Sequence, residues 1–276
     1  IHAEAHPLKN DGGGTVTGRF SYSNPNLQQI PARDPEIGKM IRSLFIPEEG
    51  ASWGVFDYSQ QEPRITVHYS ALLGLRGAAD AVNAYSNEGA DFHQIVADMA
   101  GIPRKQAKNI NLGLTYGMGQ KKLISELGLE PDEALKLLNT YHARVPFIKG
   151  IQDMCSRMGE QRGYITTLGG RKCHFDLWEP VGYLHGEKHT PLPEQEAREK
   201  YGDNLKRSFT YKALNKLIQG SAADMTKLAM RDLWKEGMVP HIGIHDELDY
   251  SIFNKEQSDM VIDRMVNCVD LKVPLV

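Results

Sequence analysis

The chain has 276 residues, 41% of them hydrophobic, which is enough to bury a substantial core in one large domain or two medium ones. It contains no run of about 18 apolar residues, so it encodes no membrane-spanning helix. The 3 cysteines are far apart and form no CxxC pair, which gives no support to a zinc site and suits a reducing, cytosolic setting. The net charge of −3 argues against a uniformly basic, nucleic-acid-binding surface.

The charge is nevertheless unevenly distributed. Residues 101–125 and 204–223 contain several lysines and arginines but no acidic residue. Local basic patches of this kind can contact phosphates while the rest of the surface stays acidic. An ordinary solvated helix face is the alternative for each single lysine, so the composition leaves a nucleic-acid partner open.

The predicted elements begin with an irregular region. Residues 1–33 are rich in glycine, asparagine and proline and are predicted to form a loop, followed by a helix at 34–45. The apolar run that ends at Asp57 is typical of a short strand. Pro63 suits the first turn of the next helix, which is predicted for residues 64–75.

From there to about residue 163 the pattern is almost entirely helical. The further predicted helices are 92–100, 104–116, 120–127, 131–144 and 146–161. A hairpin with a Gly-Gly turn at 164–175 and a surface insertion with a short charged helix at 176–204 follow. A long helix at 209–236, a hairpin around Asp246 and a helix near 255–269 complete the prediction.

Two aspartates lie where reactive groups are often found. Asp57 and Asp246 each follow a short strand-like segment, and a rigid sheet presents reactive groups at its edge in this way. Hard cations such as Mg²⁺ are held by a few carboxylates together with water and substrate phosphates. Taken singly, Asp57 could instead cap a helix and Asp246 could lie in a hairpin turn. Brought together by the fold, they would form a cation site.

Between the two aspartates, a stripe of side chains recurs every four residues. Pro103 occupies the favoured first helical position, and Arg104, Lys108, Leu112 and Tyr116 then lie on one helix face. The cations are at the helix start, where the macrodipole also attracts phosphate, and the aromatic ring at the far end can stack on a base. At a rise of about 1.5 Å per residue the stripe is roughly 18 Å long, which suits a nucleotide. A solvated basic face that runs into the core is the alternative.

Five segments of the chain resemble signatures of the family A DNA polymerases, the DNA polymerase I group. Residues 57–64 are similar to motif A, residues 104–117 to motif B and residues 245–247 to motif C. Residues 17–31 and 218–224 resemble two further signatures. Each segment alone could arise by chance. All five occur in the order of the family and together cover nearly the whole chain, which makes the ensemble specific.

The resemblance implies an α+β fold with an antiparallel palm sheet, which carries the catalytic carboxylates, and a mostly helical fingers subdomain. We expect residues 1–62 to be the N-terminal part of the palm with motif A, and 63–163 to be the helical fingers with motif B. Residues 164–276 would be the C-terminal part of the palm, with motif C and the insertion at about 176–204. We also expect the parent polymerase to extend beyond both ends of this sequence.

The activity that the resemblance implies is template-directed addition of deoxynucleotides to a primer 3′-hydroxyl with release of pyrophosphate. Asp57, Asp246 and the main-chain carbonyl of Tyr58 would bind two Mg²⁺ ions for phosphoryl transfer. The expected partners are primer-template DNA and deoxynucleoside triphosphates. We expect a monomer in the cytoplasm, that of the bacterial host if the protein is encoded by a phage.

The resemblance also assigns roles at the nucleotide. Lys108 would neutralise the α-phosphate and donate a proton to pyrophosphate, Arg104 would hold the γ-phosphate, and His93 would contact the β-phosphate. Each could instead be ordinary surface charge. Tyr116 would stack near the new base pair, and Glu62, packed against Tyr116, would exclude a ribose 2′-hydroxyl. Residues that resemble primer-template contacts of the family are Arg19, Asn26, Gln28, Arg33, Asn215, Gln219 and His245.

Three residues depart from the family pattern. Gln61 and Pro63 replace apolar residues that are usual in motif A, and Leu112 stands where bacterial members usually carry phenylalanine or tyrosine. Leu112 would face the incoming sugar and base, so it bears on nucleotide selectivity and speed. These features and the segment 209–215 resemble a bacteriophage member more than a bacterial one.

Three other functions stay open. A single-subunit RNA polymerase shares the two aspartates and the fingers helix, but Glu62 opposes it because such enzymes need room for the 2′-hydroxyl. A metal-dependent nuclease could use the same carboxylates but would not explain the stripe on residues 104–116. The third is a primer-template binding module that folds without catalysing, and a primer-extension assay with Mg²⁺ distinguishes it.

Overall fold

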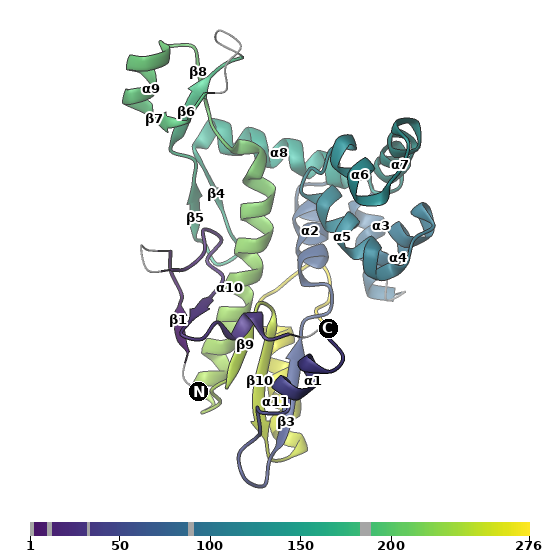
Figure 1. Cartoon of the computed structure of the whole chain (residues 1–276), viewed down its shortest axis with the longest axis vertical. Coiled ribbons are helices and arrows are strands. Elements are labelled where there is room, and N and C mark those ends of the chain that lie inside the picture. Colours follow the sequence, from purple (N-terminus) through teal and green to yellow (C-terminus); the bar gives the residue numbers. More distant parts are fainter. Residues whose placement is uncertain (1–2, 10–12, 32–33, 88–90, 183–188) are drawn as a thin grey trace. The chain divides into compact units, whose positions relative to one another are not determined.

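The structure of the chain is a computed structural model, which describes residues 3–9, 13–31, 34–87, 91–182 and 189–276 (Figure 1). The chain forms two compact units. We call residues 1–65 and 219–276 the sheet unit, and residues 66–218 the helical unit. The chain passes from one to the other within helix α2 (Gln61–Leu72) and returns within helix α10 (Ala213–Lys235).

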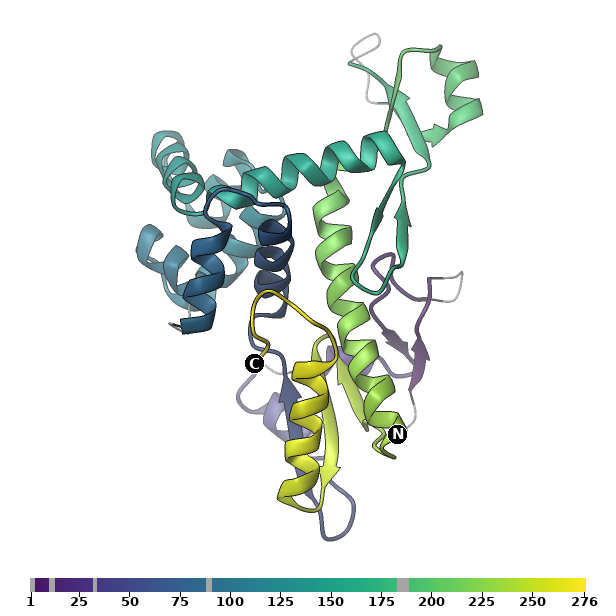
Figure 2. The same ribbon diagram turned by 180° about the vertical axis from the view of Figure 1, so that it is seen from behind.

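The sheet unit is built on an antiparallel sheet in the order β3-β10-β9. Its strands are β3 (Ser52–Asp57), β9 (Ile242–Ile244) and β10 (Glu247–Ile252). Helix α11 (Lys255–Asn267) lies against β3 and β10, as Figure 2 shows from behind. Leu248 (0% exposed) and Tyr250 (1% exposed) share one face of β10, and Asp249 and Ser251 on the other face are buried as well.

The first part of the chain differs from the predicted loop. Strands β1 (Glu4–His6) and β2 (Ser21–Ser23) pair antiparallel, and a short 3₁₀ helix η1 (Leu27–Gln29) follows. Helix α1 (Ile37–Arg42) is shorter than the predicted 34–45, because the Asp34 carboxylate accepts hydrogen bonds from the backbone of Glu36 and Ile37 (2.9 and 2.7 Å) and so precedes the helix.

The helical unit confirms most of the predicted helices. They are α4 (Phe92–Ala100), α5 (Arg104–Thr115), α6 (Gln120–Leu127), α7 (Pro131–Arg144) and α8 (Pro146–Arg162). Helix α2 starts before the predicted residue 64, so Pro63 lies inside its first turn, where a missing N–H is tolerated. Helix α3 (Ala78–Asn87) was not predicted, because its buried face consists largely of alanines and gives only a weak periodic signal.

The remainder of the helical unit contains short strands. The predicted hairpin is formed by β4 (Tyr164–Thr166) and β5 (Lys172–His174). The insertion contains the expected charged helix, α9 (Glu194–Tyr201), but also an unpredicted antiparallel sheet of β6 (Leu177–Pro180), β7 (Leu192–Pro193) and β8 (Leu205–Arg207) in the order β7-β6-β8. Pro180 and Pro193 lie at the ends of β6 and β7, where a missing N–H costs no hydrogen bond between strands.

The long helix α10 also starts later than predicted. Phe209 adopts a left-handed backbone conformation (φ 62°), and the 3₁₀ helix η2 (Thr210–Lys212) intervenes before α10. Residues 164–218, which we expected in the palm, lie in the helical unit. The assignment of palm and fingers therefore stays a prediction. No helix in the described part of the chain is long and apolar enough to cross a membrane.

Candidate active site

The sheet unit places the two aspartates at one edge of its sheet. Asp57 is the last residue of β3, and Asp246 lies in the turn between β9 and β10. The register pairs Asp57 with Glu247, the neighbour of Asp246. His245 takes the left-handed conformation that this turn needs (φ 59°). The edge thus gathers carboxylates from two segments far apart in the sequence.

The charges at this edge are incompletely balanced. Burial raises the pKa of the Asp246 carboxyl to about 6, and the negative charges of Asp57 and Glu62 add to the rise, while Arg19 opposes it. Burial likewise raises the pKa of Glu247. Because carboxylates at close quarters disfavour one another's ionised form, a cation at this edge would be attracted strongly.

Arg19 and Glu62 form an ion pair beside these aspartates. The guanidinium donates to Glu62 Oε1, and the two side chains are only 20% and 16% exposed. Burial lowers the pKa of His245, and the charge of Arg19 lowers it further. Four of the predicted site residues of the sheet unit, Asp246, Arg19, Glu62 and His245, are therefore close enough to influence one another.

Tyr58 and Gln61 use their side chains for packing. The Tyr58 hydroxyl donates to the Met265 carbonyl oxygen (2.8 Å), so its main chain alone is left at the sheet edge. Gln61 is 3% exposed, and its amide donates to Thr226 Oγ1 (3.2 Å) and to the Ala222 carbonyl (3.4 Å). Gln61 is therefore a buried residue whose amide is hydrogen-bonded, and it supplies no charge to the site.

The predicted primer-template contacts occupy several elements. Asn26 caps η1, where its Oδ1 accepts from the Gln28 backbone (3.1 Å), and the Gln28 amide donates to the Phe20 carbonyl (3.1 Å). Asn215 and Gln219 are half-buried on α10, one turn apart. Arg33 lies outside the described residues.

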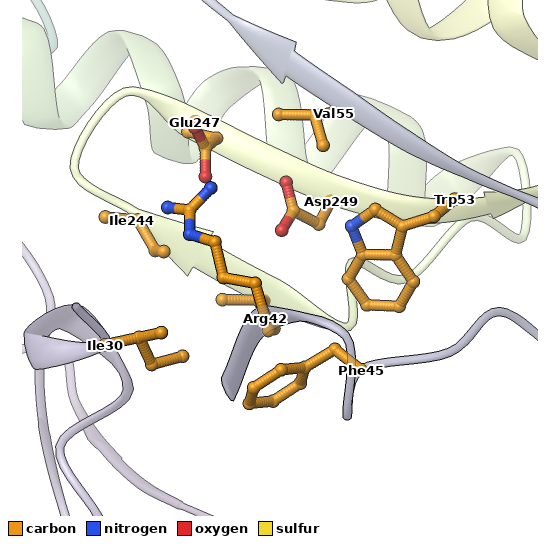
Figure 3. A pocket seen from close by; sticks show the side chains of 9 residues that line it. Ile30, Arg42, Phe45, Trp53, Val55, Ile244, Glu247 and Asp249 are labelled. Atoms are coloured by element: carbon orange, nitrogen blue, oxygen red, sulfur yellow. The ribbon is translucent and has the colours of Figure 1, made fainter. Parts of the chain in front are cut away.

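A hollow of about 140 Å³ opens on the sheet face that carries Asp57 (Figure 3). Asp249 and Trp53 line it, and the Arg42 guanidinium points toward Glu247. Asp249 is 6% exposed, and burial raises its pKa to about 6 despite a hydrogen bond from Trp53. Its Oδ1 has no hydrogen-bond partner among the described residues. Asp249 was not identified from the sequence. An acidic residue within the apolar run of β10 is the pattern that could have revealed it.

The helical unit carries the predicted stripe on α5. Arg104 and Lys108 are exposed, whereas Leu112 and Tyr116 are half-buried. The helix ends at Thr115, and Tyr116 is its C-cap residue. The stripe thus runs from exposed cations at the helix start to partly buried apolar groups at its end. This order is the one expected for binding a molecule with an anionic end and an aromatic end.

Asp91 connects the start of α5 with the start of α4. Its Oδ1 accepts from the backbone N–H groups of His93 (2.9 Å) and Gln94 (3.2 Å), and its Oδ2 accepts from Arg104 Nε (2.5 Å). Burial alone would raise the pKa of Asp91, but these hydrogen bonds lower it. Among the described residues, the two terminal nitrogens of Arg104 have no hydrogen-bond partner, so they can receive an anion.

His93 lies close to both cations. It is 3% exposed, and its Nδ1 is 3.1 Å from Asn111 Nδ2. Burial lowers the pKa of the imidazole, and the charges of Lys108 and Arg104 lower it further, against the opposing charge of Asp91. The structure therefore brings His93, Arg104 and Lys108 together as a site that favours anions. Asp91 and Asn111 were not identified from the sequence.

No group of three or more His, Cys, Asp and Glu side chains within the described ranges could hold a metal ion. The predicted donor set is smaller than that, with two carboxylates and one main-chain carbonyl. Carboxylate and carbonyl oxygens are the ligands that Mg²⁺ prefers, and this ion keeps several waters. The donors at the sheet edge therefore fit the chemistry of this ion.

Comparisons with known proteins agree with the motifs. The chain is 36% identical to a DNA-directed DNA polymerase of Pseudomonas phage M6, over 95% of this chain and 42% of the relative. It is 34% identical to the thermostable DNA polymerase I of Thermus aquaticus, over 85% of this chain and 26% of the relative. The chain thus spans less than half the length of these relatives.

A solved structure shares the fold. It is the POL domain of Pol1 from M. smegmatis in complex with a DNA primer-template and dNTP, with a TM-score of 0.76 and 29% identity. The match covers 100% of this chain and 46% of that chain, and it confirms the predicted mixture of helices and antiparallel sheet. The model of the family "DNA polymerase family A" matches residues 6–276. The resemblance inferred from the five segments is thereby confirmed, and the chain belongs to DNA polymerase family A.

Proposed function

We propose that this chain is the polymerising part of a template-directed DNA polymerase, which adds deoxynucleotides to a primer 3′-hydroxyl by two-metal-ion phosphoryl transfer and releases pyrophosphate. One observation carries the proposal. Asp57 and Asp246 come together at one sheet edge, where burial, together with the negative charge of Asp57, raises the pKa of Asp246 to about 6. Membership in DNA polymerase family A supports it, as does the similar POL domain that binds a primer-template and dNTP.

Asp57, Asp246 and the main-chain carbonyl of Tyr58 would hold two Mg²⁺ ions. When bound, such ions lower the pKa of the attacking hydroxyl and stabilise the charge on the transferred and leaving phosphates. The contribution of the chain is to hold the two carboxylates rigidly at the ends of paired segments. The two carboxylates repel each other when no cation is bound, so a site of this kind favours the binding of cations.

The triphosphate would be held by the cluster on α4 and α5. Arg104 offers the two terminal nitrogens that Asp91 leaves available, and this fork suits the γ-phosphate. Lys108, one helical turn further on, would neutralise the α-phosphate and donate a proton to the leaving pyrophosphate. His93 would contact the β-phosphate. Beyond them, Leu112 would lie beside the sugar.

Selection of the nucleotide would depend on Glu62 and Tyr116. Glu62 would fill the space that a ribose 2′-hydroxyl needs, and Arg19 holds its carboxylate by an ion pair. Tyr116 would stack near the new base pair. The amides and cations Arg19, Asn26, Gln28, Arg33, Asn215, Gln219 and His245 would contact primer-template DNA. Groups of this kind suit the acceptors that correct base pairs share in the minor groove.

The subdomain assignment follows the same proposal. Residues 1–62 and 164–276 would form the palm, and residues 63–163 would form the fingers. The partners would be primer-template DNA and deoxynucleoside triphosphates, and we expect a monomer in the cytoplasm. Relatives encoded by bacteriophages favour a bacterial host cell as that compartment.

Primer extension with the 276-residue chain and Mg²⁺ tests the proposal. We expect template-directed addition of deoxynucleotides that Asp57→Asn abolishes. Circular dichroism of both proteins confirms that they are folded. If the folded chain binds primer-template DNA but adds no nucleotide with Mg²⁺ or Mn²⁺, the binding-module alternative is correct for this part of the polymerase.

A further inference from the structure

A buried chain of hydrogen bonds runs behind the cation stripe, inside the helical unit. Thr115 Oγ1 lies 3.5 Å from the Tyr141 hydroxyl, which lies 3.0 Å from Asn111 Oδ1. Asn111 Nδ2 lies 3.1 Å from His93 Nδ1. The exposures of the four residues are 9%, 1%, 5% and 3%, so water does not compete for these bonds. This series of hydrogen bonds connects α5 with α7 at one end and with α4 at the other.

The donors in this series of hydrogen bonds follow from the bond between Tyr141 and Asn111. The Tyr141 hydroxyl donates to Asn111 Oδ1. The oxygen of the amide is therefore engaged, and its nitrogen faces the imidazole. An amide nitrogen can only donate, so His93 Nδ1 must accept and cannot carry a proton. A neutral imidazole with an unprotonated Nδ1 has its proton on Nε2.

We propose that Asn111 and Tyr141 are positioning residues, which hold His93 as the neutral tautomer with its proton on Nε2 and so present that N–H to a phosphate oxygen of the incoming nucleotide. This inference rests on the proposed function, because it deepens the role of His93 at the triphosphate. Tyr141 acts one step further back. Its hydroxyl fixes which end of the Asn111 amide faces the imidazole.

The surroundings of His93 favour the same neutral state. Arg104 and Lys108 face it from α5, and both disfavour a further positive charge. Asp91 precedes it on α4 and opposes them, but burial and the two cations prevail, and the pKa is lowered. A protonated Nδ1 would also direct its N–H at the Asn111 amide N–H. Nε2 has no hydrogen-bond partner among the described residues, so it can donate to a ligand.

A neutral donor suits a site that already has two cations. Arg104 and Lys108 supply the charge that attracts a triphosphate, and a third charge would also retain pyrophosphate after the reaction. A tautomer fixed before the nucleotide arrives avoids the cost of reorganising the imidazole at that moment. The same geometry makes protonation of His93 at low pH incompatible with the Asn111 hydrogen bond.

Nitrogen-15 NMR of the histidine rings tests the tautomer without any need for activity. The His93 signals are assigned by their loss in His93→Gln. In the wild type we expect an unprotonated Nδ1 and a protonated Nε2 at neutral pH. In Asn111→Asp the new carboxylate accepts from Nδ1–H, so we expect protonation of Nδ1 and titration at higher pH. A wild-type ring protonated on Nδ1, or an Asn111→Asp ring that is unchanged, would overturn the inference.

Tyr141→Phe gives a milder variant, with Thr140→Val as its matched control. Both remove one hydroxyl from α7, but the Thr140 hydroxyl donates to the Lys136 carbonyl on the exposed side of that helix. We expect Tyr141→Phe to produce a mixture of tautomers and Thr140→Val to leave the wild-type one. If His93 keeps the single Nε2–H tautomer in Tyr141→Phe, Tyr141 does not have the proposed role.

Single-nucleotide insertion then tests the contact with phosphate. We expect Tyr141→Phe to raise KM for the nucleotide by roughly two- to tenfold with little change in kcat, the loss of one positioned hydrogen bond. Thr140→Val should leave KM unchanged. A shifted tautomer with unchanged KM would refute the phosphate contact of His93. The failure of the proposed function is distinguishable, because the wild type itself would then add no nucleotide.

Discussion

The edge of the sheet unit and the cluster on α4 and α5 are electrostatic opposites. At the edge, burial raises the pKa of Asp246, and the negative charges of Asp57 and Glu62 raise it further. In the cluster, burial lowers the pKa of His93, and the positive charges of Lys108 and Arg104 lower it further. Charges of one sign predominate in each region, although Arg19 lies at the edge and Asp91 lies in the cluster. A ligand of the other sign would relieve this repulsion, so the electrostatics support the proposed binding of a divalent cation at the edge and of a triphosphate at the cluster.

The two regions also differ in how firmly they hold their groups. Asp57 and Asp246 have short side chains at positions fixed by strand pairing. Arg104 and Lys108 have long side chains with several rotatable bonds on an exposed helix face. Short, rigid groups suit the stringent octahedral geometry of Mg²⁺, while long cations can follow a flexible triphosphate. Asp91 restrains only one nitrogen of Arg104.

The largest expected effect comes from removing a charge at the sheet edge. Asp57→Asn or Asp246→Asn should lower the rate of nucleotide addition by roughly a thousandfold or more, because binding of the ions and stabilisation of the transition state weaken together. Primer extension measures this effect. Without Mg²⁺, Asp246→Asn should unfold at the same or a higher temperature than the wild type, since the repulsion is gone. Extension near the wild-type rate would contradict the assignment.

The next effect concerns sugar selection beside the same edge. Glu62→Ala should lower discrimination against ribonucleotides by roughly tenfold or more while deoxynucleotides still bind, because the proposed role is steric. Single-nucleotide insertion with both substrates measures it. Glu62→Gln is the matched control, since it fills the same volume without the charge and should keep the discrimination. If both variants lose it equally, the Arg19 ion pair rather than size is responsible.

Asp249 tests whether a buried carboxylate that is not a proposed metal ligand lowers the free energy of unfolding. Its pKa is raised from 3.8 to about 6, so its ionised form destabilises the fold increasingly as the pH rises through that interval. Asp249→Asn should therefore raise the free energy of unfolding at pH 7 by roughly 1–2 kcal/mol. The gain should vanish below about pH 4. Urea unfolding at the two pH values measures this gain in the free energy of unfolding. Asp270→Asn, at an exposed position, is the control. An equal gain at the two pH values would show that ionisation of Asp249 is not the cause.

The smallest expected effect lies in the helical unit. Leu112 is one helical turn from both Lys108 and Tyr116, so a ring there should contact the sugar. A gained aromatic contact is worth about 0.5–1.5 kcal/mol, so Leu112→Phe should raise the insertion rate by roughly three- to tenfold. Discrimination against dideoxynucleotides should change as well. A slower variant with unchanged selectivity would show that phenylalanine overpacks the half-buried position.

The sequence predicted the placement of those candidate site residues that are neighbours on one element. The stripe from Arg104 to Tyr116 is visible because a helix repeats every four residues or so. Asp57 is visible because it ends an apolar strand. Helix α3 was missed since alanines give little contrast, and the sheet in the insertion was missed since prolines at its strand ends suggest loops.

The partners of the predicted residues could not be found in this way. Arg19 pairs with Glu62, which lies 43 positions away, and Asp91 pairs with Arg104, which lies 13 positions away beyond helix α4. Such contacts depend on how elements pack, and periodicity within one element carries no information about that. The orientation of His93 likewise depends on Asn111, which lies on another helix.

The pairing of Asp57 with Glu247 also determines what happens when the sheet assembles wrongly. Successive residues of a strand face opposite sides, so a slip of one residue between β3 and β10 would turn one strand over relative to the other. Asp57 would then lie opposite Asp246 or Leu248 instead of Glu247, and its side chain would turn to the other face of the sheet. A molecule with this slip would lose the arrangement of Asp57 and Asp246 altogether, because the register of a strand pair changes only by whole residues.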